Sequence, residues 1–85
     1  MMIHVLYFAW LRERAGQAEE HLALPPGIGT VGALAGWLRA RDAAGAAVFA
    51  DLAVIRAAVN QVFAAPDAGI VDGDEVAFFP PVTGG

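Results

Sequence analysis

The chain has 85 residues, no cysteine and a formal net charge of −4, with charged residues at 16% and apolar residues at 58%. This length suits one small domain, and the lack of cysteine excludes disulfides, thiolate metal sites and a cysteine nucleophile. The acidic balance argues against a nucleic-acid partner, because nucleic-acid binding depends on neutralising phosphates.

The chain begins with a pattern typical of two strands. Met2–Trp10 is a run of β-forming residues in which both alternating sets are largely apolar, and this predicts a central strand. His4 and Phe8 belong to the same alternating set, and the polar His4 indicates that their face is the less protected one. Leu11–Ala18 is polar and predicts a turn, and Glu19–Leu24 predicts a second strand, so the two strands suggest a hairpin.

The main helix is predicted after the breaker residues of the Pro25-Pro26-Gly27 segment. Thr30 is a suitable N-cap, because its hydroxyl can accept a hydrogen bond from a free amide of the first turn. The helix should run to about Arg41, with an apolar stripe made by Val31, Leu34 and Trp37. The alanine-rich Asp42–Asp51 segment, broken by a glycine, predicts a second short helix or an irregular turn.

The C-terminal half predicts three more strands. Val54–Val59 and Val62–Ala64 flank Asn60-Gln61, which suggests a third strand, a tight turn and a short fourth strand. Asp72-Gly73 predicts a turn, because glycine permits backbone conformations closed to other residues. Glu75–Phe79 then predicts the last strand.

The element order predicts an α+β fold, a mixed sheet with one main helix packed on one face. In the last strand Phe79 shares a face with Glu75, so we expect an exposed aromatic side chain just before the tail. If the first and last strands are neighbours, Phe8 and Phe79 lie on the same uncovered face. We expect residues 1–79 to form the domain and residues 80–85 to form an extended tail.

The tail reads Pro80-Pro81-Val82-Thr83-Gly84-Gly85. The two prolines cannot donate to a sheet ladder and act as a stiff spacer, and six extended residues span roughly 20 Å. Two glycines without side chains allow the tip to enter a narrow channel. A carboxylate at the end is a poor electrophile and reacts only after activation, for instance as a mixed anhydride with AMP. We therefore predict that the chemistry occurs at this carboxylate and that another protein supplies the catalysis; the alternative is an ordinary frayed terminus.

Other chemical motifs are few. The chain has no serine, so a serine triad cannot be built, and no glycine-rich phosphate loop follows a strand. His4 and His21 lack metal-ligand spacing along the sequence, and Asp72-Gly73-Asp74-Glu75 lacks the other ligands of a calcium site. We therefore expect no metal site.

The composition also bears on location and partners. No run of roughly 18 apolar residues occurs, so we expect no membrane span. The first ten residues lack a basic leader and a cleavage site, so we expect no signal peptide and a cytoplasmic location. Few charged residues on a small domain leave apolar surface exposed, which we interpret as surface for a protein partner.

Three segments resemble the small subunit of molybdopterin synthase. Val5-Leu6-Tyr7-Phe8-Ala9, with Leu11-Arg12-Glu13 behind it, resembles the start of that subunit, and Val59-Asn60-Gln61 resembles its third-strand turn. Residues 72–85, DGDEVAFFPPVTGG, resemble its C-terminus almost letter for letter. The middle, about Ala43–Ala53, is only weakly matched.

The resemblance implies a β-grasp, ubiquitin-like fold and a sulfur carrier. In that family an E1-like adenylyltransferase uses ATP to adenylate the terminal glycine, and a sulfurtransferase system converts it to a thiocarboxylate. The carrier then threads its tail into the active site of the large subunit, within a heterotetramer. There it donates sulfur to cyclic pyranopterin monophosphate, forming the dithiolene of the molybdenum cofactor. The carrier is a non-catalytic subunit and binds no cofactor itself.

Carried over residue by residue, the resemblance implies a role for each matching position. Gly85 is the sulfur donor, and Gly84 is the slim approach to it. The positions that match partner contacts are Phe8, Arg12, Phe63, Phe79, Pro80, Pro81, Val82 and Thr83. The simpler interpretations are a packed hairpin residue for Phe63, a core residue for Phe8 and a solvated loop residue for Arg12.

Alternative functions stay open at this point. The sulfur carrier of thiamine thiazole synthesis has the same fold and ends in Gly-Gly, but it is usually shorter and lacks the Phe-Phe-Pro-Pro-Val run. A protein-tagging, ubiquitin-like modifier is a related variant. A ubiquitin-like interaction module without sulfur transfer is a different class, and it would keep its function after loss of the two glycines.

Overall fold

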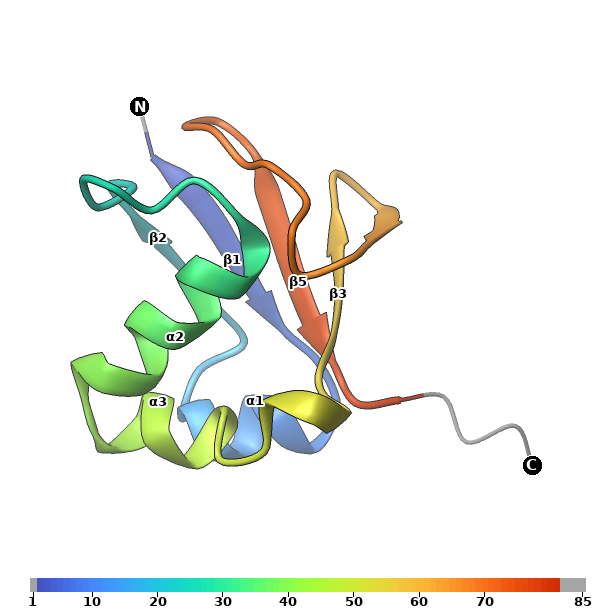
Figure 1. Ribbon diagram of the computed structural model, residues 1–85. Coiled ribbons are helices and arrows are strands. Elements are labelled where there is room, and N and C mark those ends of the chain that lie inside the picture. Colours follow the sequence, from blue (N-terminus) through green and yellow to red (C-terminus); the bar gives the residue numbers. More distant parts are fainter. Residues whose placement is uncertain (1, 82–85) are drawn as a thin grey trace.

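A five-stranded mixed sheet organises the chain, seen in a computed structural model that describes residues 2–81 (Figure 1). The strand order is β2-β1-β5-β3-β4, with β1 and β5 parallel and the other neighbours antiparallel. The elements are β1 (Ile3–Tyr7), α1 (Trp10–Ala15), β2 (Glu19–Leu22), α2 (Val31–Arg41), α3 (Ala43–Val48), the 3-10 helix η1 (Leu52–Val54), β3 (Arg56–Val59), β4 (Val62–Ala64) and β5 (Glu75–Phe79).

The α+β prediction is confirmed, since α2 packs on one face of the mixed sheet (Figure 1). The first and last strands are neighbours in the sheet, as expected, because Tyr7 of β1 lies opposite Phe78 of β5. The last strand has the predicted bounds, Glu75–Phe79. None of the helices in the described part of the chain is long and apolar enough to cross a membrane.

The segment after β1 differs from the prediction. The strand ends at Tyr7 instead of Trp10, and the helix α1 runs from Trp10, the last residue of the predicted strand, into the predicted turn at Leu11–Ala18. Ala9 turns the chain between them with φ 55, a conformation that costs an alanine about 1–3 kcal/mol. The helix forms because Leu11 is completely buried and because α1 packs beside α3, which lies far away in the sequence.

The predicted bounds of α2 are confirmed, and the segment after it forms a short helix instead of an irregular turn. Thr30 caps α2, its hydroxyl accepting a hydrogen bond from the Ala33 N–H at 3.1 Å. The expected second short helix is α3, and the Asp42 carboxylate caps it by accepting from the Gly45 N–H at 2.7 Å. A side chain on Gly45 would collide with the Leu38 carbonyl oxygen, so glycine lets α3 pack directly against α2.

The remaining strand boundaries shift slightly. β2 ends at Leu22, two residues before the predicted end. β3 begins at Arg56 instead of Val54, because η1 precedes it and the Asp51 carboxylate accepts a hydrogen bond from the Ala53 N–H. The tight turn before β4 is confirmed, with φ values of 50 and 69 at its two central residues, Asn60 and Gln61.

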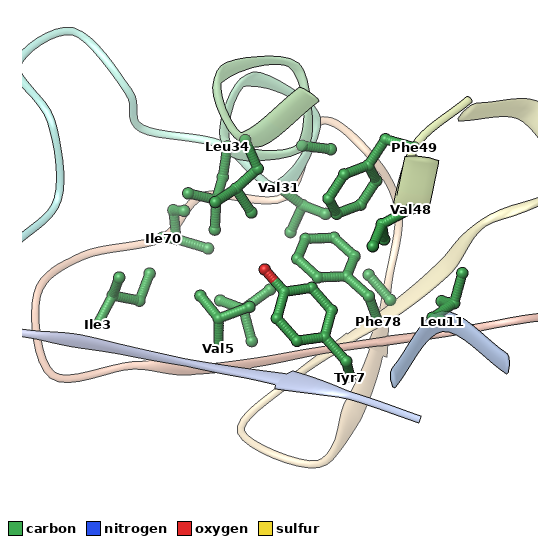
Figure 2. Close-up of a cluster of buried hydrophobic side chains, with 14 residues drawn as sticks. Ile3, Val5, Tyr7, Leu11, Val31, Leu34, Val48, Phe49, Ile70 and Phe78 are labelled. Atoms are coloured by element: carbon green, nitrogen blue, oxygen red, sulfur yellow. The ribbon is translucent and has the colours of Figure 1, made fainter. Parts of the chain in front are cut away.

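The core lies between the sheet and the helices (Figure 2). Alternate residues of β1 and β5 point into it, and Phe78 meets Phe49 edge to face with ring centroids 4.9 Å apart. Burial of each such ring stabilises the fold by about 1.5–3 kcal/mol. The fully buried side chains of largest volume are Phe49, Phe78, Ile3, Leu11, Leu34, Leu38, Val5, Val48 and Val76.

A polar network at the margin of this core joins the sheet to the helices. The Tyr7 hydroxyl donates to Glu20 Oε2 at 2.7 Å, and Arg41 at the end of α2 donates to both oxygens of Glu20 at 2.7 and 3.0 Å. Arg41 Nε also donates to the Asp42 carboxylate at 2.9 Å. The hydrogen bonds from Arg41 and, to a smaller extent, from Tyr7 hold the pKa of Glu20 below its usual range, although partial burial and the nearby Asp42 carboxylate act in the opposite direction.

Replacing Glu20→Gln should cost about 1–2 kcal/mol of unfolding free energy at pH 7, after allowance for solvent screening. Because the folded-state pKa of Glu20 is lowered from 4.5, its contribution is present above about pH 4.5 and is lost as the pH falls through the folded-state value. Urea unfolding at pH 7 and pH 3 should therefore show a smaller difference in the variant than in the parent. Glu13→Gln, at an exposed carboxylate of α1, is the control; equal acid sensitivity of both variants would contradict the role of Glu20.

Candidate functional site

The sheet face opposite the helices carries two of the site residues predicted from the sequence, Phe63 and Phe79. The strand register places one alternating set of side chains on this outer face. The set comprises Glu19 and His21 of β2, His4 and Leu6 of β1, Glu75, Ala77 and Phe79 of β5, Arg56 and Ala58 of β3, and Phe63 of β4. Figure 1 shows the helices on the other side of the sheet.

Two aromatic rings gather at one end of the outer face, and we call Phe63 and Phe79 the aromatic patch. Their ring centroids are 5.7 Å apart. Phe63 is 80% exposed, which rules out the interpretation as a packed hairpin residue. Its neighbour across the sheet is Ala58, whose small side chain leaves the ring uncovered. Phe79 is half-buried, so the expectation of an exposed ring just before the tail is met only in part, and Phe63 supplies most of the exposed aromatic surface. Exposed aromatic surface of this kind characterises surfaces that bind other proteins.

A shallow hollow of about 390 Å³ adjoins the aromatic patch. Its lining comes from the start of β3, the end of β4 and the end of β5: Arg56, Ala57, Phe63, Ala64, Ala65 and Phe79. Phe79 lines the hollow and is the last residue of β5, so the hollow lies beside the point at which the chain leaves the sheet. Figure 1 shows where the chain continues beyond β5. A partner seated on the patch would therefore also meet the base of the tail.

A second hollow, of about 430 Å³, lies on the helix side between α2 and β3. Its lining is alanine, glycine and other apolar residues, with Arg56 as the one titratable side chain. It offers no group for acid-base or nucleophilic chemistry, so the outer face remains the candidate site.

Phe8 and Arg12 border the same end of the sheet. Phe8 is 48% exposed, which rules out a core position, and its N–H donates to the Phe78 carbonyl at 3.1 Å beside the end of β5. Arg12 is exposed on α1, and within residues 2–81 its side chain forms no ion pair. Partner contact by these two residues stays a prediction.

The tail is described only at its start. Pro80 and Pro81 are half-buried. Val82, Thr83, Gly84 and Gly85, which carry the predicted reaction and its approach, lie outside the described residues. Their roles stay predictions as well.

Arg56 belongs to the site but was not singled out from the sequence. It is exposed, lies opposite Phe79 in the register and lines the hollow. Its guanidinium is held by a hydrogen bond to the Ala53 carbonyl at 2.9 Å. The available signal was a single charged residue inside the apolar run from Val54 to Val59.

The proteins that this chain resembles share its fold, and the sequence match extends to its C-terminal residues. The pattern of the ThiS family matches residues 5–85. The molybdopterin synthase sulfur carrier subunit of Escherichia coli K12 is 44% identical over 84 residues, spanning 99% of this chain and all of the relative.

Two solved structures carry the same fold. A putative molybdopterin converting factor subunit 1 from Pyrococcus furiosus is 32% identical, covers 96% of this chain and 99% of its own, and superposes with a TM-score of 0.76. The small archaeal modifier protein 1 of Haloferax volcanii is 29% identical, with coverages of 95% and 98% and the same TM-score of 0.76. The β-grasp expectation is thereby confirmed.

Proposed function

The chain belongs to the ThiS family, and we propose that it is the sulfur carrier subunit of a molybdopterin synthase. The observation that carries the proposal is the 44% identity to a molybdopterin synthase sulfur carrier subunit over both full lengths. The resemblance of DGDEVAFFPPVTGG to the end of that subunit also supports the proposal, because this segment includes Gly85, whose carboxylate is the proposed reacting group. The sulfur carrier of thiamine thiazole synthesis is not favoured.

The proposed chemistry takes place at Gly85. Its carboxylate attacks the α-phosphorus of ATP on an E1-like adenylyltransferase, and pyrophosphate leaves. A sulfide-level nucleophile delivered by a sulfurtransferase system then attacks the acyl carbon and AMP leaves, which gives a thiocarboxylate. In the active site of the large subunit, the thiocarboxylate sulfur forms a bond to cyclic pyranopterin monophosphate. Water then cleaves the acyl–sulfur bond, which leaves the sulfur on the substrate and returns Gly85 to a carboxylate. ATP is bound by the activating enzyme, and this chain contributes the acyl group that carries sulfur.

The geometry of the described residues suits a carrier that docks by its body and reacts at its tip. β5 ends at Phe79, beside Phe63 and the hollow lined by Arg56. Pro80 and Pro81 then direct the chain away from the ladder, because neither can donate a backbone hydrogen bond. Docking on the aromatic patch would hold the base of the tail and aim the tip into a partner's active site.

The proposal includes the partners and the setting that the resemblance implies. The large subunit binds the aromatic patch, Phe8 and Arg12, and two carriers sit on a dimer of large subunits in a heterotetramer. The activating enzyme uses the same surface at a different time. We place these reactions in the cytoplasm.

The test is the intact mass of the chain after incubation with its activating enzyme, ATP and a sulfur source. We expect a gain equal to the replacement of one oxygen by sulfur, mapped to the C-terminal peptide. Omission of ATP is the control. An unchanged mass with an activating enzyme that is competent on its own carrier would contradict the proposal.

A second candidate is a protein-tagging modifier, favoured by the likeness to the Haloferax volcanii protein. Both functions begin with an activated terminal glycine, so activation alone does not separate them. Transfer of sulfur to cyclic pyranopterin monophosphate with the large subunit supports the carrier. Isopeptide conjugates to lysine side chains, without any such transfer, would support the modifier.

A further inference from the structure

A cluster of potential metal ligands lies on the outer face at the opposite side of the sheet from the aromatic patch. His4 of β1 and His21 of β2 are directly opposite each other in the antiparallel register. Their imidazole rings stack with centroids 4.2 Å apart and planes 11° from parallel. Glu19 precedes His21 by two residues, so it lies on the same face, and its Oε1 is 3.1 Å from His4 Nε2.

The three side chains are close enough to share one ion. Their ligand atoms all lie within 4.8 Å of one another. His4 is half-buried, whereas Glu19 and His21 are exposed, so an ion can reach the cluster from solvent. Two imidazole nitrogens and one carboxylate oxygen form a donor set that suits Zn²⁺ and neighbouring first-row ions better than Mg²⁺ or Ca²⁺.

We propose that His4, Glu19 and His21 form a binding site for one divalent first-row transition ion such as Zn²⁺. The three ligands leave further coordination positions to water, because the cluster opens to solvent on the outer face. Spacing along the sequence did not reveal this site, since the ligands come from two strands and only the register of β1 with β2 brings them together.

Binding requires a local change that can be observed. Lone pairs of imidazole nitrogens lie in the ring planes, so the stacked rings must rotate for His4 and His21 to aim at one ion. The hydrogen bond between His4 Nε2 and Glu19 Oε1 must be replaced by two bonds to the ion, which needs little change in the 3.1 Å between these atoms. The ion then links β1 to β2, which is an edge strand, and stabilises the folded state by mass action. Glu75 lies beside His4 in the register with β5 and adds negative charge to the same face.

The histidine and cysteine content of the chain makes zinc binding simple to assign to this cluster. The chain has two histidines and no cysteine, so every imidazole signal reports on this cluster and no thiolate competes for the ion. We would titrate the chain with zinc chloride by calorimetry and follow both imidazoles by nitrogen-15 NMR. We expect one ion per chain, shifts of the His4 and His21 resonances together, and a higher Tm with zinc than with magnesium.

Substitutions distinguish specific zinc binding by the three side chains from non-specific attraction of zinc to an acidic protein. His21→Gln and Glu19→Gln each remove a proposed ligand and should weaken zinc binding at least as much as loss of a group that only orients a ligand, which costs on the order of tenfold to 100-fold. Glu13→Gln, an exposed carboxylate on α1, removes the same charge elsewhere and should bind zinc as the parent does. Equal loss in Glu19→Gln and Glu13→Gln would overturn the site, and so would unshifted imidazole resonances or one ion per two chains. Sulfur loading at Gly85 is assayed separately, so a negative result for the zinc site does not contradict the sulfur carrier function, and the reverse also holds.

Discussion

A chain extended by one alanine after Gly85 should fold normally and donate no sulfur. The extension moves the reacting carboxylate by one residue and places a methyl group where the proposal requires a slim tip. Among the described residues, the sheet finishes with β5 at Phe79 and the buried core cluster is formed by Phe78 and earlier residues. In a reconstituted assay with the large subunit and the activating enzyme, we expect molybdopterin formation to fall to background.

Two further chains complete this experiment. An alanine added ahead of Met1 changes length and mass equally and should leave sulfur transfer intact. Deletion of Gly84 and Gly85 should largely preserve binding to the large subunit, because the aromatic patch remains, while transfer disappears. Molybdopterin synthesis by the extended chain would rule out the terminal carboxylate as the sulfur donor. Undiminished synthesis by the deleted chain would favour an interaction module that carries no sulfur.

Features set by local sequence were predictable. The bounds of β5 follow from its place between the Asp72-Gly73 turn and Pro80, and the half-burial of Phe79 beside the fully buried Phe78 follows from their opposite sides of the strand. The Asn60-Gln61 turn and the Thr30 cap are likewise decided by neighbouring residues. The tail motif needed no folding argument at all.

Features set by contacts between distant segments were not predictable. The polar segment after β1 becomes helical because Leu11 finds burial beside α3, more than thirty residues later. Arg56 joins the site because β3 pairs with β5, and the two histidines meet because β1 pairs with β2. A single sequence does not show which strands pair or in which register, so it gives no distance between residues of different strands. Neither the helix α1 nor the histidine cluster could therefore be inferred.

Phe63→Asp should weaken binding to the large subunit on the order of 30-fold or more, the usual loss at an aromatic interface centre. The change removes an exposed ring from the aromatic patch and introduces a charge that docking would strip of water. Because Phe63 is 80% exposed, the substitution should leave the Tm of the free chain nearly unchanged. Calorimetric titration of the large subunit gives the affinity.

The matched control is Val71→Asp, the same kind of change at an apolar residue that is 65% exposed. Val71 lies in the loop before β5, at the opposite end of that strand from Phe79. It carries the same added charge but should bind the large subunit as the parent does. Equal weakening in both variants would mean that net charge alone controls docking, and unchanged affinity of Phe63→Asp would remove the aromatic patch from the interface. Selective weakening at Phe63 would place the partner at the end of the sheet from which the tail departs, which is the geometry that delivery of Gly85 requires.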